Sequence, residues 1–194
     1  GKPSTFTECL SLLGNSTILL CFIGIMCHVG IDVGTNTAAP QILIDRLGWT
    51  LDKAIYATSV YFIFRTIGCF SGSFLLAKLP AKIVFGVSVS FMLCAMGGLF
   101  ILSSKMAIYT CIALIGLGNS DIFPIIFSQA LLNMPKKKNE VSGLMIMGLI
   151  GGTIFPIFMG WASDTLHSQT GSVAVMTIGV LYLMFLISKI RKIA

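Results

Sequence analysis

The chain has 194 residues, of which 56% are hydrophobic and only 10% are charged, and its mean hydropathy is +0.95. Soluble domains carry about 25% charged residues, so this chain has too little charge to cover a water-exposed surface. The net charge of +6 does not indicate nucleic-acid binding, because the basic residues form short clusters between apolar runs, where they set orientation and meet lipid headgroups. The composition therefore favours a protein embedded in a lipid bilayer.

Six apolar runs are each long enough to cross a bilayer as a helix, which needs roughly 20 apolar residues. The predicted spans are Leu13–Pro40, Ala54–Ala77, Ile83–Leu102, Ala107–Asn133, Val141–Ala162 and Ser172–Ile190. Helices are favoured because lipid cannot satisfy exposed backbone groups, and the runs are too long and too continuously apolar for barrel strands. We therefore predict an all-α integral membrane bundle of six transmembrane helices that occupies 1–194 as a single unit.

The first span carries a polar stripe. His28, Asp32 and Asn36 are spaced four residues apart, which places them along one face of a helix. Such a stripe on an apolar helix is typical of a cavity wall that binds a polar solute, with Asp32 or His28 as a candidate for proton exchange. The alternative is that His28 and Asp32 satisfy each other in a purely structural role.

The second span contains Arg65 near its middle, where a charge is most expensive. Its guanidinium stays protonated and needs an acceptor. Asp32 and Asp121 are the acidic residues well inside other predicted spans, and either could form a buried ion pair with it. A pair that solute or proton could open would suit transport, whereas a fixed structural pair, or an Arg65 that reaches toward the membrane surface, would not.

The fourth span is interrupted by polar and small residues. Asn119, Ser120 and Asp121 precede Pro124, which cannot donate to the carbonyl of Ser120, so a bend or break is expected there. Polar side chains beside a broken helix are typical of solute sites at the membrane midplane, and Gln129 continues the polarity. The alternative is a kinked helix that serves packing only.

The fifth span contains a small-residue pattern. Gly148 and Gly152 form a GxxxG pair, and Pro156 and Gly160 follow. Small residues allow two helix backbones to approach closely. We interpret this face as a packing surface on which helices can rock.

Lys and Arg predict the orientation. Nine lie in alternate loops and ends, and three lie in the other loops; the nine are Lys2, Lys78, Lys82, Lys136, Lys137, Lys138, Lys189, Arg191 and Lys192, and the three are Arg46, Lys53 and Lys105. Basic residues favour the cytoplasmic side, so both termini are predicted to be cytoplasmic. Spans one and four share a Gly-containing polar patch, and spans two and five are Gly-rich, which predicts two inverted triplets of helices.

Sequence motifs give no indication of an enzyme, a cofactor or a metal site. The chain has no phosphate-binding loop, no GxSxG and no HExxH. The acidic residues do not fit the YD and GxGD pattern of intramembrane aspartyl proteases, and the repeated motif of mitochondrial carriers is missing. The six cysteines show no metal-ligand spacing and are interpreted as small buried side chains. The first methionine is Met26, so we expect a fragment or a processed chain.

The polar stretch of span four and parts of spans one and five resemble the carboxy-terminal half of the fucose:proton symporter family, within the major facilitator superfamily. The segments that carry the resemblance are Val29–Gly34, Gly118–Ser128, Ser142–Leu144, Gly151–Pro156 and Gly160–Asp164. The resemblance implies that the six spans are helices seven to twelve of twelve and that spans one and four line a central cavity. It also implies transport of hexoses or deoxyhexoses with protons or sodium.

Together these observations predict half of a secondary transporter in the cell (inner) membrane that moves a sugar by alternating access, with a missing amino-terminal half as its partner. The predicted solute-binding residues are Asp32, Asn36, Asn119, Asp121 and Gln129, and the predicted ion-pair or coupling residues are His28, Asp32, Arg65 and Asp121. The family's main proton-carrying carboxylates belong to the amino-terminal half, so the resemblance transfers no proton site to this chain. The alternatives are a six-span protein that dimerises into a transporter and a membrane scaffold or assembly factor that moves no solute.

Overall fold

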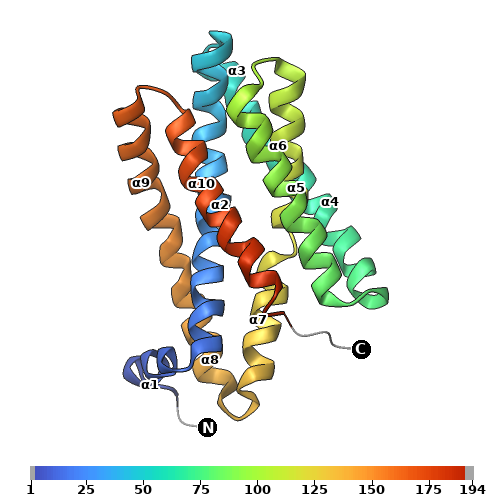
Figure 1. The fold of residues 1–194 in the computed structure, drawn as a ribbon, viewed down its shortest axis with the longest axis vertical. Helices are drawn as coiled ribbons and strands as arrows, with labels where there is room; N and C mark the ends of the chain where they lie inside the picture. Colours follow the sequence, from blue (N-terminus) through green and yellow to red (C-terminus); the bar gives the residue numbers. More distant parts are fainter. Residues whose placement is uncertain (1–2, 191–194) are drawn as a thin grey trace.

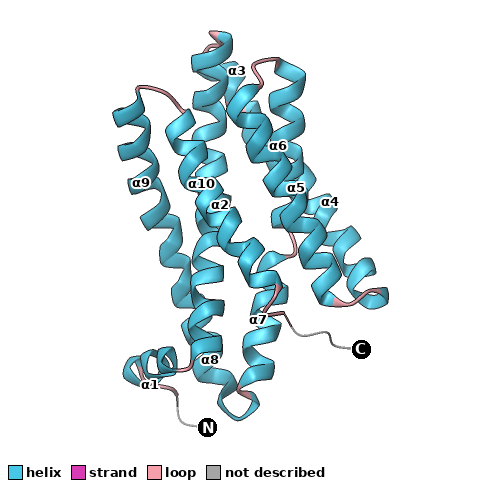
Figure 2. Cartoon of the chain, viewed as in Figure 1, coloured by secondary structure: helices cyan, strands magenta, loops and turns pink. Residues whose placement is uncertain are grey.

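The computed structural model describes residues 3–190, and this part of the chain is helical without strands (Figures 1 and 2). Within residues 3–190, six helical segments are long and apolar enough to span a membrane. In chain order the helices are α1 (Phe6–Ser11), η1 (Leu12–Gly14), α2 (Ser16–Leu47), α3 (Leu51–Ala54), α4 (Tyr56–Lys78), α5 (Ala81–Ile101), α6 (Lys105–Asn119), α7 (Ile122–Asn133), η2 (Pro135–Lys137), α8 (Lys138–Met147), η3 (Gly148–Ile150), α9 (Gly151–Leu166) and α10 (Thr170–Ile187). The predicted six-helix fold class is confirmed.

The first span differs from its prediction at its carboxyl end. The helix does not stop at Pro40 but continues to Leu47, because the flanking residues Ile42 and Leu43 are fully packed in the core. Membrane helices tolerate an internal proline because neighbouring groups compensate for the lost backbone hydrogen bond. The helix ends where Gly48 adopts a left-handed φ of 66°, which a glycine accommodates without strain.

The amino end contains a short helix that was not predicted. Thr5 caps α1, and the Thr5 and Glu8 side chains each accept a hydrogen bond from the other's backbone. Asn15 then caps α2 by accepting from the amides of Thr17 and Ile18 at 3.0 and 3.2 Å. These caps fix where the first spanning helix begins.

The spanning helices pack in two groups of three that share the centre of the bundle. α2 packs with α9 and α10, whereas α4 and α5 both pack on α6. α10 also contacts α5, and α2 contacts α4, α6 and α7, so the two groups form one bundle (Figure 1). Gly148 and Gly152 of span five pack on α2 as expected, because a methyl group on Gly148 would collide with Ile25 and one on Gly152 would press on Val29 and Val33. Gly160, in contrast, has open space around it.

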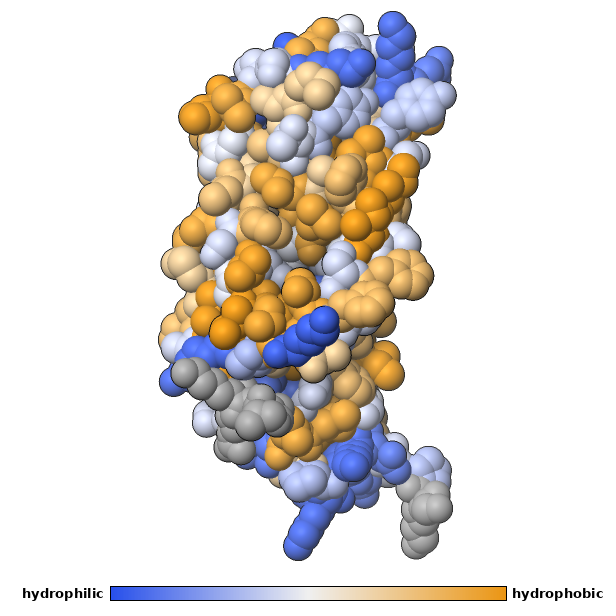
Figure 3. All heavy atoms as spheres, turned by 90° about the vertical axis from the view of Figure 1, so that its right-hand side faces the viewer, coloured by the Kyte–Doolittle hydropathy of each residue, from blue (hydrophilic) through white to orange (hydrophobic). Residues whose placement is uncertain are grey.

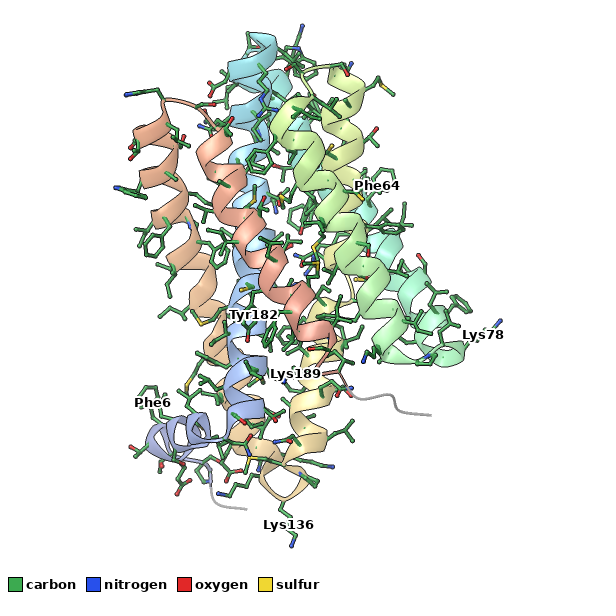
Figure 4. The ribbon with its side chains drawn as sticks, viewed as in Figure 1. Phe6, Phe64, Lys78, Lys136, Tyr182 and Lys189 are labelled. Atoms are coloured by element: carbon green, nitrogen blue, oxygen red, sulfur yellow. The ribbon has the colours of Figure 1, made fainter. Side chains whose placement is uncertain are left out.

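The face drawn in Figure 3 shows a broad hydrophobic band between two more hydrophilic ends. Lys78, Lys136 and Lys189 all lie in the lower half of Figure 4, on loops or ends that the sequence assigns to the cytoplasmic side. α1 and the end of α10 also lie toward this lower side (Figure 1). The basic residues Lys2, Arg191 and Lys192, which the orientation count includes, lie outside the described residues.

Candidate solute-binding site

Three helices place polar side chains at the same depth. Asp32 lies near the middle of α2, Arg65 lies near the middle of α4, and Asn119 is the last residue of α6, midway between Lys105 and the end of α7. Because α2 contacts both α4 and α6, these side chains converge in the centre of the bundle. The interior of a membrane penalises polar groups strongly, so such a cluster at midplane depth indicates a functional site.

A hydrogen-bonded chain connects the three helices. His28 Nδ1 lies 2.8 Å from Asn119 Oδ1, and Asn119 Nδ2 donates to the His28 carbonyl and to the Tyr61 hydroxyl, both at 3.2 Å. The Tyr61 hydroxyl in turn donates to Asp32 Oδ1. Since the amide oxygen can only accept, His28 Nδ1 carries a proton, and the side-chain hydrogen bonds run from His28 through Asn119 and Tyr61 to the Asp32 carboxylate.

The same carboxylate oxygen meets a cation. Arg65 Nε lies 3.0 Å from Asp32 Oδ1, and the two side chains are 29% and 24% exposed. Asn119 and Tyr61 are completely buried, and His28 is 3% exposed. The ion pair is therefore the accessible end of the network, and the hydrogen-bonded chain behind it fixes the position of the carboxylate.

Two polar atoms beside Asp32 lack hydrogen-bond partners. Over the described residues, the buried side-chain nitrogen and oxygen atoms without a partner are Arg65 Nε and Asn36 Oδ1. The Nε–H group is close to Asp32 but is not directed along a hydrogen bond, so that contact is electrostatic. Asn36 uses its Nδ2 to donate to the Asp32 carbonyl at 2.9 Å, which leaves its side-chain oxygen unused. Arg65 Nε therefore interacts with Asp32 through charge, and Asn36 Oδ1 is an unused acceptor one helical turn along α2 from Asp32.

The break in span four occurs where the sequence predicts it. α6 ends at Asn119 and α7 begins at Ile122. Pro124 has no N–H group to donate to the Ser120 carbonyl, and Cys69 Sγ donates to that carbonyl instead, at 3.7 Å. The break turns Asp121 toward α4, where its carboxyl group fills the space beside Gly72. A methyl group on Gly72 would overlap that carboxyl group.

The structure brings most predicted site residues together. Asp32, Asn119, His28 and Arg65 join one network, and Asn36 lies beside it. His28 and Asp32 do not satisfy each other, since each has other partners. Asp32, rather than Asp121, pairs with Arg65.

Asp121 and Gln129 lie outside this network. Asp121 is 7% exposed, and its Oδ2 lies 3.4 Å from Ser120 Oγ. Gln129 is buried toward the opposite end of α7, where it lines a cavity of about 20 Å³ with residues such as Asn133 and Lys189. That volume holds about one water molecule and no sugar.

Sequence reasoning missed Tyr61. A tyrosine in an apolar span resembles an ordinary packing or interfacial residue, and only its three-dimensional neighbours identify it as the link between Asn119 and Asp32. The available signal was its spacing, since Tyr61 lies one helical turn before Arg65 and therefore shares a face with it. The described residues contain no group of His, Cys, Asp or Glu arranged to hold a metal ion.

Comparison by sequence finds transporters. No family model matches the chain. A protein of Helicobacter pylori (strain ATCC 700392 / 26695) that is named as a candidate glucose/galactose transporter is 28% identical over 158 residues, which cover 80% of this chain and 38% of that protein. A glucose/galactose transporter of Brucella abortus (biovar 1, strain 9-941) is 28% identical over 156 residues, which cover 77% and 36% of the two chains. This chain thus spans well under half the length of these relatives.

Comparison by structure also finds a transporter. FucP, a major facilitator superfamily transporter in its outward conformation, matches with a TM-score of 0.82 and 17% identity over 97% of this chain and 46% of FucP. The chain has the major facilitator fold. A variant of the E. coli fucose:proton symporter FucP matches to the same extent. The resemblance to the fucose:proton symporter family is confirmed, and the proteins that the chain matches are named as transporters rather than as enzymes.

Proposed function

We propose that this chain is the carboxy-terminal half, helices seven to twelve, of a transporter that moves a sugar of the hexose or deoxyhexose class by alternating access. The network around Asp32 forms one wall of the solute site. A missing amino-terminal half supplies the opposite wall, which agrees with the 38% and 46% of the matched proteins that the chain covers. The names of those proteins, which include glucose, galactose and fucose, support the substrate class.

The observation that carries this proposal is the Arg65–Asp32 ion pair with the hydrogen-bonded chain behind it. Asn36 Oδ1, one helical turn from Asp32, has no donor, and a buried polar group without a partner costs about 1–3 kcal/mol. A sugar hydroxyl is both donor and acceptor, so it can donate to the Asp32 carboxylate or accept from the Arg65 guanidinium. The partial exposure of Asp32 and Arg65 keeps this part of the network accessible to a solute.

The network also offers a means of coupling. The Asp32 carboxylate is held by Arg65 and by the Tyr61 hydroxyl. A proton bound to Asp32 would weaken its attraction to Arg65 and free the guanidinium to contact the solute. Proton binding and solute binding then favour the same rearrangement, which is the requirement for symport.

Hexose uptake by cells that express the intact gene tests the proposal. Asn119→Ala removes the residue that links His28 to Tyr61, and uptake of the transported sugar should fall about tenfold or more. Asn133→Ala is the matched control, because Asn133 is an amide on the same span whose Nδ2 donates to Asn15 Oδ1 at 3.2 Å, outside the Asp32 network. The proposal is wrong if no hexose is taken up by the unmodified protein, or if both variants transport equally well. If no hexose is taken up, a membrane scaffold that moves no solute becomes the better description; if both variants transport equally well, the solute site lies away from Asn119.

The coupling step has a separate test. Addition of sugar to deenergised cells should make the medium more alkaline if protons enter with the solute, and Asp32→Asn should abolish this change. If the unmodified protein moves sugar without a pH change but requires sodium, the coupling ion is sodium and the protonation of Asp32 has no role. We propose the inner membrane as the location, with both termini cytoplasmic.

A further inference from the structure

A second pocket lies far from the Asp32 network, at the end of the bundle where α3 and α6 begin (Figure 1). It has a volume of about 530 Å³, is open to the surroundings, and is lined by Trp49, Lys53, Tyr56, Val60, Lys105 and Tyr109. Tyr56 lies nine residues before Arg65 on the same helix, or about 13 Å along its axis. The pocket is therefore separate from the solute site.

The pocket contains most of the basic residues at its end of the bundle, which has fewer basic residues than the other end. The basic residues at this end are Arg46, Lys53 and Lys105, and two of them line the pocket. Arg46 instead donates to the Leu102 carbonyl at 2.9 Å. The acidic residues at this end are Asp45, Asp52 and Asp164; Asp45 and Asp164 line a different pocket beside α9, Asp52 precedes Lys53 on α3, and none of the three lines this pocket. The concentration of lysines in one pocket favours an anionic ligand.

Aromatic rings fix one of these charges in place. Lys105 Nζ lies 5.4 Å from the centre of the Trp49 ring, and the Trp49 and Tyr109 rings are 6.0 Å apart. Lys105 is also the first residue of α6, whose amino terminus adds partial positive charge to the same place. Ser104 caps the amide of Ala107, which leaves earlier amides of that turn available to an anion.

Exposed apolar side chains adjoin the lining residues in the sequence. Leu51, Ile55 and Met106 lie within two residues of lining residues and are 59%, 52% and 73% exposed, and these three are called the apolar rim. Tyrosine and tryptophan also favour the boundary between water and hydrocarbon. A basic, aromatic pocket with an exposed apolar rim at the end of membrane helices matches a ligand with an anionic head and an apolar tail.

We propose that this pocket binds the phosphate headgroup of an anionic phospholipid, with Lys53 and Lys105 as its ligands and its acyl chains along Leu51, Ile55 and Met106. A free phosphate ion would also bind the two lysines, but it has no acyl chain to contact Leu51, Ile55 and Met106. Each lysine near an anionic surface contributes about a five-fold preference for the charged lipid. The zwitterionic phosphatidylcholine lacks this advantage.

Fluorescence quenching by brominated lipids tests this proposal on the intact protein in lipid nanodiscs. The signal of Trp49 is the difference between the unmodified protein and Trp49→Phe. We expect brominated phosphatidylglycerol, at the same minor fraction in phosphatidylcholine, to quench Trp49 several-fold more effectively than brominated phosphatidylcholine. Lys53→Gln combined with Lys105→Gln should remove this preference. Lys136→Gln combined with Lys137→Gln, a matched loss of two lysines at the other end of the bundle, should leave it unchanged.

Equal quenching by the two lipids would overturn the proposal, as would a preference that survives in the Lys53→Gln, Lys105→Gln protein. Inorganic phosphate provides the remaining distinction. If millimolar phosphate abolishes the lipid preference, the pocket is a site for free anions and the lipid assignment is wrong. Gel filtration of each variant confirms that it is folded, and Lys53→Gln alone, which leaves the Lys105 contact with Trp49 intact, should lose part of the preference.

Discussion

Arg65 Nε lies 3.0 Å from Asp32 Oδ1, at the middle of two helices that cross the same bilayer. The pair combines two opposite requirements. Each charge needs the other because hydrocarbon offers no solvation, yet a site that binds and releases solute needs charges that can separate. Their exposures of 29% and 24% place the pair where a solute hydroxyl can compete for either partner.

Loss of one charge should destabilise the protein more than loss of both. Asp32→Asn or Arg65→Gln alone leaves a partly buried charge without a counter-ion, and we expect a loss of about 2 kcal/mol in the free energy of unfolding. The double variant should recover a large part of this loss, measured by thermal unfolding in detergent. Additive losses would show that the two charges do not interact.

Tyr61→Phe should reduce transport without much loss of stability. The substitution removes the hydroxyl that holds Asp32 and accepts from Asn119, which costs about 1 kcal/mol in stability and releases the carboxylate from its position. Tyr182→Phe is the control, because the Tyr182 hydroxyl donates to the Leu20 carbonyl at 2.7 Å, outside the network. Hexose uptake should fall only in the first variant; equal uptake in both would show that Tyr61 has a packing role.

Gly72→Ala should destabilise the protein through Asp121. The added methyl group would displace the Asp121 carboxyl group, and overpacking of this kind costs about 1–3 kcal/mol. Gly97→Ala, on a helical position with open space around it, should be neutral or slightly stabilising. In an Asp121→Ala background the cost of Gly72→Ala should shrink, and thermal unfolding of the four proteins measures this coupling. An unchanged cost would locate the clash elsewhere.

Cysteine labelling can test the orientation. In a protein without its natural cysteines, Lys137→Cys should react only with reagents that reach the cytoplasm, whereas Ser168→Cys should react with an impermeant maleimide added outside. The reason is the excess of basic residues on the side of Lys137. The reverse pattern would contradict the assignment of both termini to the cytoplasm.

Much of the fold follows from the sequence because the bilayer leaves few choices. Long apolar runs must become helices, and the interruption at Ser120 and Pro124 could be placed within two residues. The end of the first span could not be predicted, since a proline such as Pro40 often ends a helix. The packing of Ile42 and Leu43 in the core explains why the helix continues past it.

The candidate site was partly predictable for a related reason. Charges in hydrocarbon are conspicuous, so Asp32 and Arg65 could be selected from the sequence, but the choice between Asp32 and Asp121 as the partner depends on helix rotation. Tyr61 has no conspicuous sequence signal, and the distance of Gln129 from the network depends on the length of α7. Contacts between helices decide these points, and spacing within one helix does not reveal them.

Hexose uptake by proteoliposomes that contain the intact transporter tests the role of the Asp32 network most directly. Asp32→Asn should lower the initial rate at least about tenfold under an imposed proton gradient, because the carboxylate that meets both Arg65 and Tyr61 is lost. Asp52→Asn, which changes an exposed carboxylate at the end of the bundle, should keep the rate of the unmodified protein. Equal uptake by both variants would contradict the account.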